Sequence, residues 1–65
     1  QMDIRQAMLL LTPAERICIQ LAVIEGLSVR RVAQIIQMNE NTVKTHIKRG
    51  KEKLKTYLIN NGYDR

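Results

Sequence analysis

The chain has 65 residues, enough for one small domain, and its apolar side chains are almost all aliphatic, because it contains no Phe, no Trp and only two Tyr. This composition favours helices packed on helices over a sheet. Eleven Lys and Arg against six Asp and Glu give a formal net charge of +5, so the expected partners are anionic: nucleic acid, an acidic protein face or a membrane surface.

The single cysteine, Cys18, excludes an internal disulfide and a cysteine-based metal site, and we expect it to be a small core residue. No cofactor is expected. A lone thiol fits a reducing, cytoplasmic setting, and no apolar run has the length of a signal sequence or a membrane span. The chain begins with Gln1 instead of Met, which suggests a domain from a longer protein, and residues 1–65 are interpreted as a single unit without repeats or linkers.

The first predicted helix covers Asp3 to Leu10, with Asp3 as its cap and apolar residues at helical spacing. The next four residues, Thr12 to Glu15 (T-P-A-E), form a capping box with Pro at the first helical position, which is the clearest helix start in the chain. This second helix is expected to run to Glu25, with Gly26 as a left-handed stop. Its apolar residues are Ile17, Cys18, Leu21 and Ile24.

The second half of the chain predicts two further helices. Ser28 can cap a helix from Val29 to Ile36, and Asn39 can cap a long helix from Glu40 to about Asn60, which Gly62 would close. The buried face of the third helix is expected to consist of Val32, Ala33, Ile35 and Ile36.

A break of three residues, Gln37 to Asn39, separates these helices, and the small Ala33 lies in the middle of the first. This is the helix-turn-helix pattern, in which the two helices cross closely. The predicted fold class is all-α: a small four-helix domain containing a helix-turn-helix with a long C-terminal recognition helix.

The fourth helix has two different sides, since a helix advances about 100° per residue. Its apolar side consists of Val43, Ile47, Gly50, Leu54 and Leu58. Its polar side presents Asn41, Lys44, Thr45, Lys48, Lys51 and Lys55. From Glu40 to Leu58 six basic and two acidic residues give a net +4, which is most of the charge of the chain.

This charge predicts DNA binding, although a solvated lysine face is the alternative interpretation. The first turn offers short polar side chains of the size that reaches base edges, and the lysines follow where a helix leaving the groove passes phosphates. Gly50 is expected to make room for another helix, and His46 to lie at the surface or contact a phosphate.

Three segments resemble region four, the C-terminal DNA-binding domain of bacterial sigma factors, particularly the extracytoplasmic-function type: AMLLLTPAER, EGLSVRRVAQII and NTVKTHIKRGKEKLKTYL. LTPAER, EGLS and TVKTH also resemble the LuxR-type output domain of response regulators. The spacing of 15 positions from Leu11 to Gly26 and the basic segment KRGKEKLKTYL favour the sigma pattern.

The sigma resemblance implies sequence-specific binding of double-stranded promoter DNA at the minus-35 element, with the RNA polymerase core and an anti-sigma factor as further partners, and neither catalysis nor membrane contact. It implies DNA contacts from Lys44, Thr45, Lys48 and Arg49, with Glu40, Asn41 and His46 nearby. Base readout is expected from Asn41, Lys44 and Thr45, and phosphate contacts from Lys48, Arg49 and Lys51.

Two residues depart from the family pattern. Arg31 occupies the place of a glutamate that can pair with an arginine such as Arg16, so that ion pair is not expected and Arg31 becomes a candidate phosphate contact. Gln37 occupies a turn position that is often Gly. The alternatives to a sigma domain are a dimeric LuxR-type regulator, which would bind a palindrome, and a module for binding RNA polymerase or an anti-sigma factor.

Overall fold

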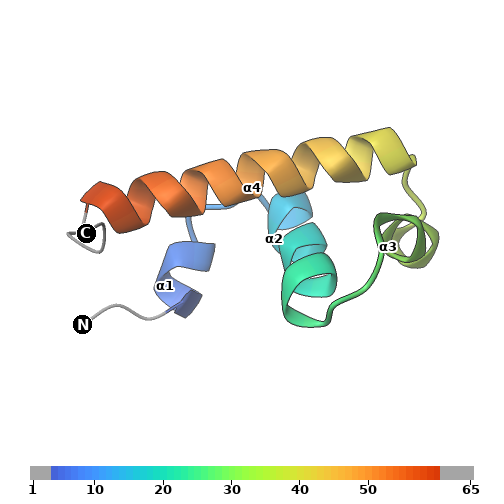
Figure 1. Cartoon of the computed structure of the whole chain (residues 1–65), viewed down its shortest axis with the longest axis horizontal. Coiled ribbons are helices and arrows are strands. Elements are labelled where there is room, and N and C mark those ends of the chain that lie inside the picture. Colours follow the sequence, from blue (N-terminus) through green and yellow to red (C-terminus); the bar gives the residue numbers. More distant parts are fainter. Residues whose placement is uncertain (1–3, 61–65) are drawn as a thin grey trace.

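The structure, a computed structural model, describes residues 4–60. Its elements are α1 (Ile4–Met8), α2 (Pro13–Ile19), the π-helical segment η1 (Gln20–Ile24), α3 (Val29–Ile36) and α4 (Glu40–Asn60). With 21 residues, α4 is about 31 Å long and spans most of the 36 Å longest dimension of the molecule. The shorter helices lie along one side of it, α1 near its C-terminal end and α3 near its N-terminal end (Figure 1). Within residues 4–60 every regular element is helical, which confirms the predicted all-α class.

Side-chain caps begin α2, α3 and α4 where the sequence predicts them. The Thr12 amide donates to Glu15 Oε1 at 3.0 Å and the Glu15 amide donates to Thr12 Oγ1 at 3.2 Å, which completes the capping box. Ser28 Oγ accepts from the Arg31 amide at 3.1 Å, and Asn39 Oδ1 accepts from the Asn41 amide at 2.7 Å. The first amides of a helix have no partner within the helix, and these side chains accept from them. The capping residues therefore determine where each helix starts.

The first helix is shorter than predicted. It ends at Met8, and the amides of Leu10 and Leu11 donate three residues back, to the carbonyls of Ala7 and Met8. This tighter pattern turns the chain toward the capping box instead of extending the α-helix. The Asp3 cap and the closing Gly62 lie outside the described residues.

The second predicted helix, expected to be α-helical to Glu25, has a different conformation in its last part. It is α-helical only to Ile19 and continues as the π-helix η1, in which the Glu25 amide donates to the Gln20 carbonyl at 2.9 Å. Val23 and Ile24 are exposed, and so is Ile17 in the α-helical part. Gly26 has φ +77°, which confirms it as the left-handed stop.

The core has two parts, both covered by α4. The first joins α2, α3 and α4 through Cys18, Val32, Ala33 and Val43, and the second joins α1 and α2 to α4 through Met8, Leu11 and Ile19. Cys18 is fully buried, as predicted, and burial raises the pKa of its thiol. The three shorter α-helices therefore pack against α4, whereas η1 packs against α2 and α3.

Some residues predicted on buried faces are exposed. Ile35 is 48% exposed, because it lies about 100° around α3 from Ile36 and away from the side that contacts α4. Leu58 is 38% exposed, beyond the part of α4 that the core clusters reach. No helix within residues 4–60 combines the length and the apolar character needed to cross a membrane.

Gly50 lies on the buried side of α4, as predicted. A Cβ atom at this position would lie 2.7 Å from Cγ1 of Ile19, closer than side chains approach one another. The glycine therefore allows α4 to cross α2 at close range.

Candidate nucleic-acid interface

The turn between α3 and α4 contains a residue in the left-handed conformation. Gln37 has φ 58° and ψ 50°, and its amide donates to the Ala33 carbonyl. Gln37 therefore adopts the left-handed conformation that favours Gly at this position, and this conformation costs free energy for a residue with a Cβ atom. Ala33, 6% exposed, packs in the core beneath this turn, as the helix-turn-helix pattern predicts.

The first turns of α4 present the short polar side chains to the outside. Asn41 is exposed, with its amide bound by the cap Asn39. The Thr45 hydroxyl donates to the Asn41 carbonyl at 3.0 Å, so its proton is used within the helix. Thr45 can still accept a hydrogen bond, and its methyl group is suited to the methyl group of thymine.

The basic residues of α4 form two rows. Lys44, Lys48, Lys51 and Lys55 follow one another at intervals of three or four residues, so they lie along one flank over about 16 Å. All four are exposed, and none is paired with an acidic side chain in the described part of the chain. Their charges remain available to an anionic partner.

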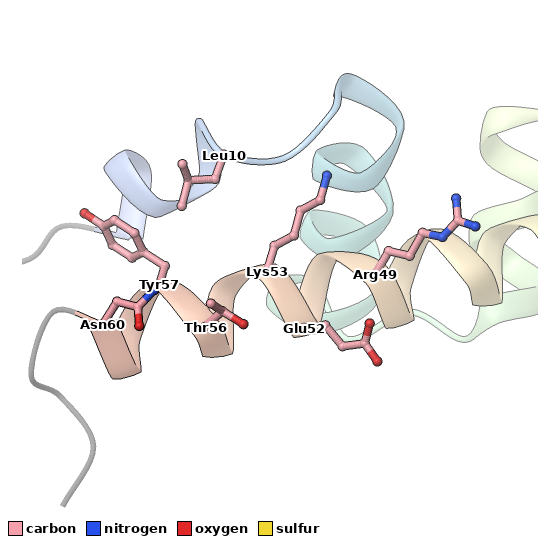
Figure 2. A pocket seen from close by; sticks show the side chains of 7 residues that line it. All are labelled: Leu10, Arg49, Glu52, Lys53, Thr56, Tyr57 and Asn60. Atoms are coloured by element: carbon pink, nitrogen blue, oxygen red, sulfur yellow. The ribbon is translucent and has the colours of Figure 1, made fainter.

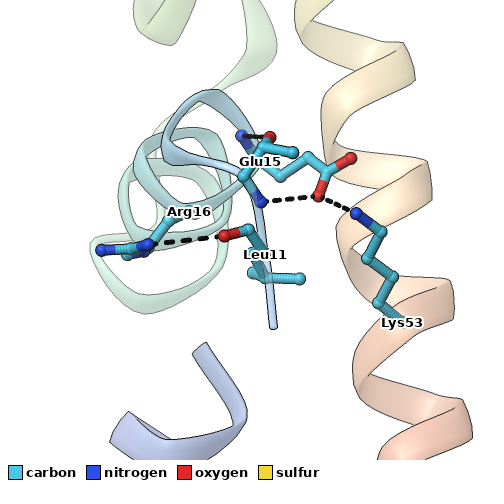
Figure 3. A network of polar contacts seen from close by, with 5 residues as sticks. Leu11, Glu15, Arg16 and Lys53 are labelled. Carbon is cyan, nitrogen blue, oxygen red and sulfur yellow. Dashed lines mark hydrogen bonds and ion pairs between the residues drawn. The ribbon is translucent and has the colours of Figure 1, made fainter. Parts of the chain in front are cut away.

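The second row, Arg49 and Lys53, has a different use. Lys53 Nζ lies 2.7 Å from Oε1 of Glu15 at the start of α2 (Figure 3). The hydrogen bond from Lys53 and that from the Thr12 backbone hold the pKa of the buried Glu15 carboxyl below its ordinary value. Lys53 therefore stabilises the fold, whereas Arg49 is exposed and makes no ion pair within residues 4–60.

His46 was predicted to lie at the surface or contact a phosphate, and it is only partly exposed. Its ring is half-buried, and its Nδ1 atom is buried without a hydrogen-bond partner among the described residues. Because part of the ring faces the protein, fewer of its atoms can reach DNA than those of Asn41 or Lys44. Its contact with DNA stays a prediction.

Arg31 is exposed on α3, and Arg16 makes no ion pair with an acidic side chain within the described range. Arg16 instead donates from Nη2 to the Leu11 carbonyl at 3.4 Å (Figure 3), and its Nε atom is buried without a hydrogen-bond partner among residues 4–60. This agrees with the expectation that the family's arginine–glutamate pair is missing here. The contact of Arg31 with phosphate stays a prediction.

Two residues missed by sequence reasoning lie beside the recognition helix. Arg30 and Gln34, four residues apart on α3, line a hollow with the turn and the first residues of α4, Met38 to Asn41. The position of Ala33 could have indicated them, because it is the residue between Arg30 and Gln34 at which α3 approaches α4. Both side chains are exposed.

A separate groove follows the other flank of α4, toward its C-terminal end (Figure 2). Leu10 and Tyr57 lie at one end of it and Arg49 at the other. Leu10 is 49% exposed, and apolar Leu9 and Ile59 are also exposed in this part of the molecule. The residues that line the groove are Leu10, Arg49, Glu52, Lys53, Thr56, Tyr57 and Asn60.

Residues 5–60 contain no cluster of three or more His, Cys, Asp and Glu side chains that could hold a metal ion.

The chain matches the family described as sigma-70, region 4, over residues 1–54. No curated protein and no solved structure has a significant match to the chain. The match includes the helix-turn-helix and most of α4. The chain therefore belongs to the sigma-70 region 4 family, whose members are DNA-binding domains, not enzymes, that recognise the minus-35 promoter element and bind RNA polymerase in transcription initiation.

Proposed function

We propose that the first three turns of α4 enter the major groove of the minus-35 element. Asn41, Lys44 and Thr45 read base edges there, and Lys48, Arg49 and Lys51 contact phosphates. The observation that carries this proposal is the exposure of these six residues on a helix whose opposite side is fixed to the core through Val43 and Gly50.

The directions of the side chains support this division for Asn41 and Thr45. Lys48 and Arg49 are consecutive and point about 100° apart, on either side of the line through Asn41 and Thr45. Such a pair can reach phosphates on both sides of a groove while the residues between them face the bases. Glu40 and His46 lie within the same turns and remain predicted contacts at the edge.

An acid limits the proposed contact along α4. Glu52 is exposed and lies on the outward line of Asn41 and Thr45, about two turns beyond Thr45. A carboxylate is repelled by phosphates, so the segment that faces DNA is expected to end near Lys51. From Glu40 to Lys51 this segment is about 16 Å long, comparable to the roughly 12 Å width of the major groove.

The proposed mechanism involves no chemical reaction. Phosphate neutralisation supplies most of the affinity, and binding tethers RNA polymerase at the promoter. Affinity is expected to fall by a factor on the order of a thousand between low and physiological salt, because each phosphate contact releases condensed counterions. A cytoplasmic location and membership of the extracytoplasmic-function group are part of this proposal.

Fluorescence anisotropy tests the proposal with three duplexes at two salt concentrations: a minus-35 type, a scrambled sequence and a LuxR-type palindrome. Preference for the first duplex as a 1:1 complex, with a steep loss of affinity at the higher salt, is expected. Two chains bound to the palindrome would instead indicate the dimeric regulator.

Protein binding is a second candidate function, favoured by the groove beside Leu10 and Tyr57. Its exposed apolar end can contact RNA polymerase or an anti-sigma factor while the flank of Lys44 and Lys48 holds DNA. Arg49, at the other end of the groove, lies between the two surfaces. Reversal of charge at Lys44 and Lys48 separates the two functions. If DNA affinity stays unchanged in that variant, protein binding is the primary function of the domain.

A further inference from the structure

A hollow lies between α1 and the segment formed by α2 and η1, and no residue of α4 lines it. The residues that line it are Arg5, Met8, Leu9, Arg16, Gln20 and Ile24. The helices α1 and α2 pack on the core side of α4, whereas the proposed DNA contacts lie on its outward side. The hollow is therefore separate from the DNA interface, and it shares no residue with the groove beside Leu10 and Tyr57.

Arg16 brings to this hollow a partly buried cation that no acid neutralises among residues 4–60. Its guanidinium donates a long hydrogen bond to the Leu11 carbonyl, and its Nε atom is buried without a partner within the same range. The side chain lies on the side of α2 turned away from Lys53 and α4 (Figure 3). A buried donor without an acceptor costs free energy, and a carboxylate matches a guanidinium best because it accepts from two of its nitrogens together.

The rest of the lining adds positive charge, an amide and apolar surface. Arg5 supplies a second guanidinium, Gln20 offers a side-chain amide, and no described acidic residue lines the hollow. Met8 belongs to the core, whereas Leu9 and Ile24 are 72% and 57% exposed. Gln20 and Ile24 are the first and last residues of η1, and π-helical segments are frequent at functional sites. The lining therefore fits an anion that has aliphatic groups beside it.

This combination favours a protein partner over the other anionic occupants. A phosphate of DNA brings no aliphatic group to cover Leu9 and Ile24, and the proposed DNA contacts lie on the outward side of α4. A second copy of the chain would bring a net charge of +5 to a hollow lined by two arginines, so the copies repel each other.

We propose that the hollow binds an acidic side chain of a partner protein, presented between aliphatic residues on an amphipathic helix. The carboxylate pairs with the guanidinium of Arg16, Arg5 adds to the attraction, and the aliphatic neighbours cover Leu9 and Ile24. The partner thereby supplies the acid that the family pattern has at the position of Arg31. The contact leaves the outward side of α4 free, so the domain binds this partner and DNA at the same time, and the proposal does not depend on which bases α4 reads.

NMR titration of the isotope-labelled 65-residue chain tests the proposal. The probe is a synthetic helical peptide with Leu and Glu on one face, and the comparison peptide has Gln in place of each Glu. The Glu peptide is expected to shift the Nε–H signal of Arg16 and the amide signals of Leu9 and Ile24. At these signals it should bind about ten-fold more tightly than the Gln peptide, since only a carboxylate makes charged hydrogen bonds. The same affinity is expected in the presence of a saturating minus-35-type duplex.

Substitutions separate the charge of the hollow from its apolar surface. Arg16→Gln is expected to weaken binding of the Glu peptide several-fold and to leave binding of the Gln peptide unchanged, whereas Ile24→Ala should weaken both. The matched controls are Arg31→Gln and Ile35→Ala, which remove the same charge and the same side chain at exposed positions of α3 outside the hollow. Both controls should bind the Glu peptide like the unmodified chain. Far-UV circular dichroism checks the fold, and the exposed Ile24 keeps the test decisive if Arg16→Gln loses structure.

Equal affinities for the two peptides, full affinity of a folded Arg16→Gln variant, or Glu-peptide shifts confined to α4 would each overturn the proposal. Displacement of the peptide by the duplex, or by inorganic phosphate at equal ionic strength, would assign the hollow to a phosphate instead. A shift of the Arg16 signal with chain concentration, without peptide, would assign it to a second copy and also overturn the proposal. A failure of the proposed function is recognised separately, in the anisotropy titrations with DNA, which contain no peptide.

Discussion

Lys53 of α4 donates to Glu15 of α2 at 2.7 Å, across 38 residues of sequence. The same carboxylate oxygen accepts from the Thr12 amide, so one buried acid both begins α2 and binds it to the recognition helix. A capping box ordinarily satisfies only the amides of its own helix. Here it also fixes the long helix that carries the proposed DNA contacts, and it removes one lysine from the charge available to DNA.

This ion pair makes stability sensitive to acid. The hydrogen bond from Lys53, helped by that from Thr12, lowers the pKa of Glu15 in the folded chain below its ordinary value of 4.5. The unfolded chain takes up this proton at a higher pH than the folded chain does. The contribution of Glu15 to stability is therefore complete above the unfolded pKa and is lost as the pH falls through the folded pKa. Thermal unfolding is expected to show a falling Tm over this range, and Glu15→Gln is expected to reduce the fall.

Lys53→Met should also lower Tm at neutral pH, because it leaves the buried carboxylate without its cation. Lys55→Met is the matched control: it removes an exposed lysine that makes no ion pair within residues 4–60, and should leave Tm nearly unchanged. Equal acid sensitivity in the Glu15→Gln variant and the unmodified chain would contradict this explanation.

Gly50→Ala is expected to destabilise the fold although Ala favours helices by about 1 kcal/mol over Gly. The new Cβ would lie 2.7 Å from Cγ1 and 3.1 Å from Cδ1 of Ile19, a buried and β-branched residue with little freedom to move. Overpacking of this kind typically costs about 1–3 kcal/mol, so a net loss of about 1 kcal/mol is expected in urea unfolding.

The contact with Ile19 can be tested directly in the background of Ile19→Ala, which removes both atoms. There Gly50→Ala should become neutral or stabilising. Gly26→Ala is the contrasting case. Its φ is +77°, and beyond its chain neighbours no atom lies within 4 Å of a new Cβ, so the loss of stability comes from the backbone conformation and should persist in the Ile19→Ala background. Equal losses from Gly50→Ala in both backgrounds would exclude the proposed contact.

The sequence predicted the features of the fold that depend on neighbouring residues. The capping box at Thr12 and the caps Ser28 and Asn39 act within three residues, and the stop at Gly26 joins Leu27 to Leu21, so a short linear pattern contains the necessary information. The exposed polar side of α4 follows from helical periodicity in the same way.

The errors concern features that depend on tertiary packing. Periodicity assigned Ile35 to a buried face, but α3 is only eight residues long and its neighbours cover one side of it. The π-helical turns of η1 were not predictable from spacing, because they change the spacing itself. The bond from Lys53 to Glu15 joins distant segments, and no local signal distinguished Lys53 from the other lysines of α4.

Gln37→Gly is expected to stabilise the domain. Gln37 has φ 58°, a left-handed conformation that costs about 1–2 kcal/mol for a residue with a Cβ atom. Glycine avoids this cost, but it makes the unfolded chain more flexible, which lowers stability by about 0.5–1 kcal/mol. A net increase of about 0.5–1 kcal/mol in the free energy of unfolding is therefore expected in urea. Gln34→Gly makes the same change inside α3, where it should destabilise by about 1 kcal/mol. If both variants lose stability alike, the backbone of Gln37 is not strained.

Lys44→Ala and Lys51→Ala are expected to separate base reading from phosphate binding. Lys44 lies in the second turn of α4, within the proposed reach of base edges, and its loss should reduce discrimination between minus-35 and scrambled duplexes by about 1–3 kcal/mol. Lys51 lies about 10 Å further along the helix, so its loss should weaken both duplexes about equally and reduce the salt slope by about 1. Anisotropy titrations of both duplexes at several salt concentrations measure the two quantities together.

Because both lysines are exposed on the same flank and carry the same charge, a difference between the variants reports the effect of position along α4. If Lys51→Ala alters sequence preference while Lys44→Ala does not, then the C-terminal part of α4 reads the bases and the proposed orientation of the helix is wrong.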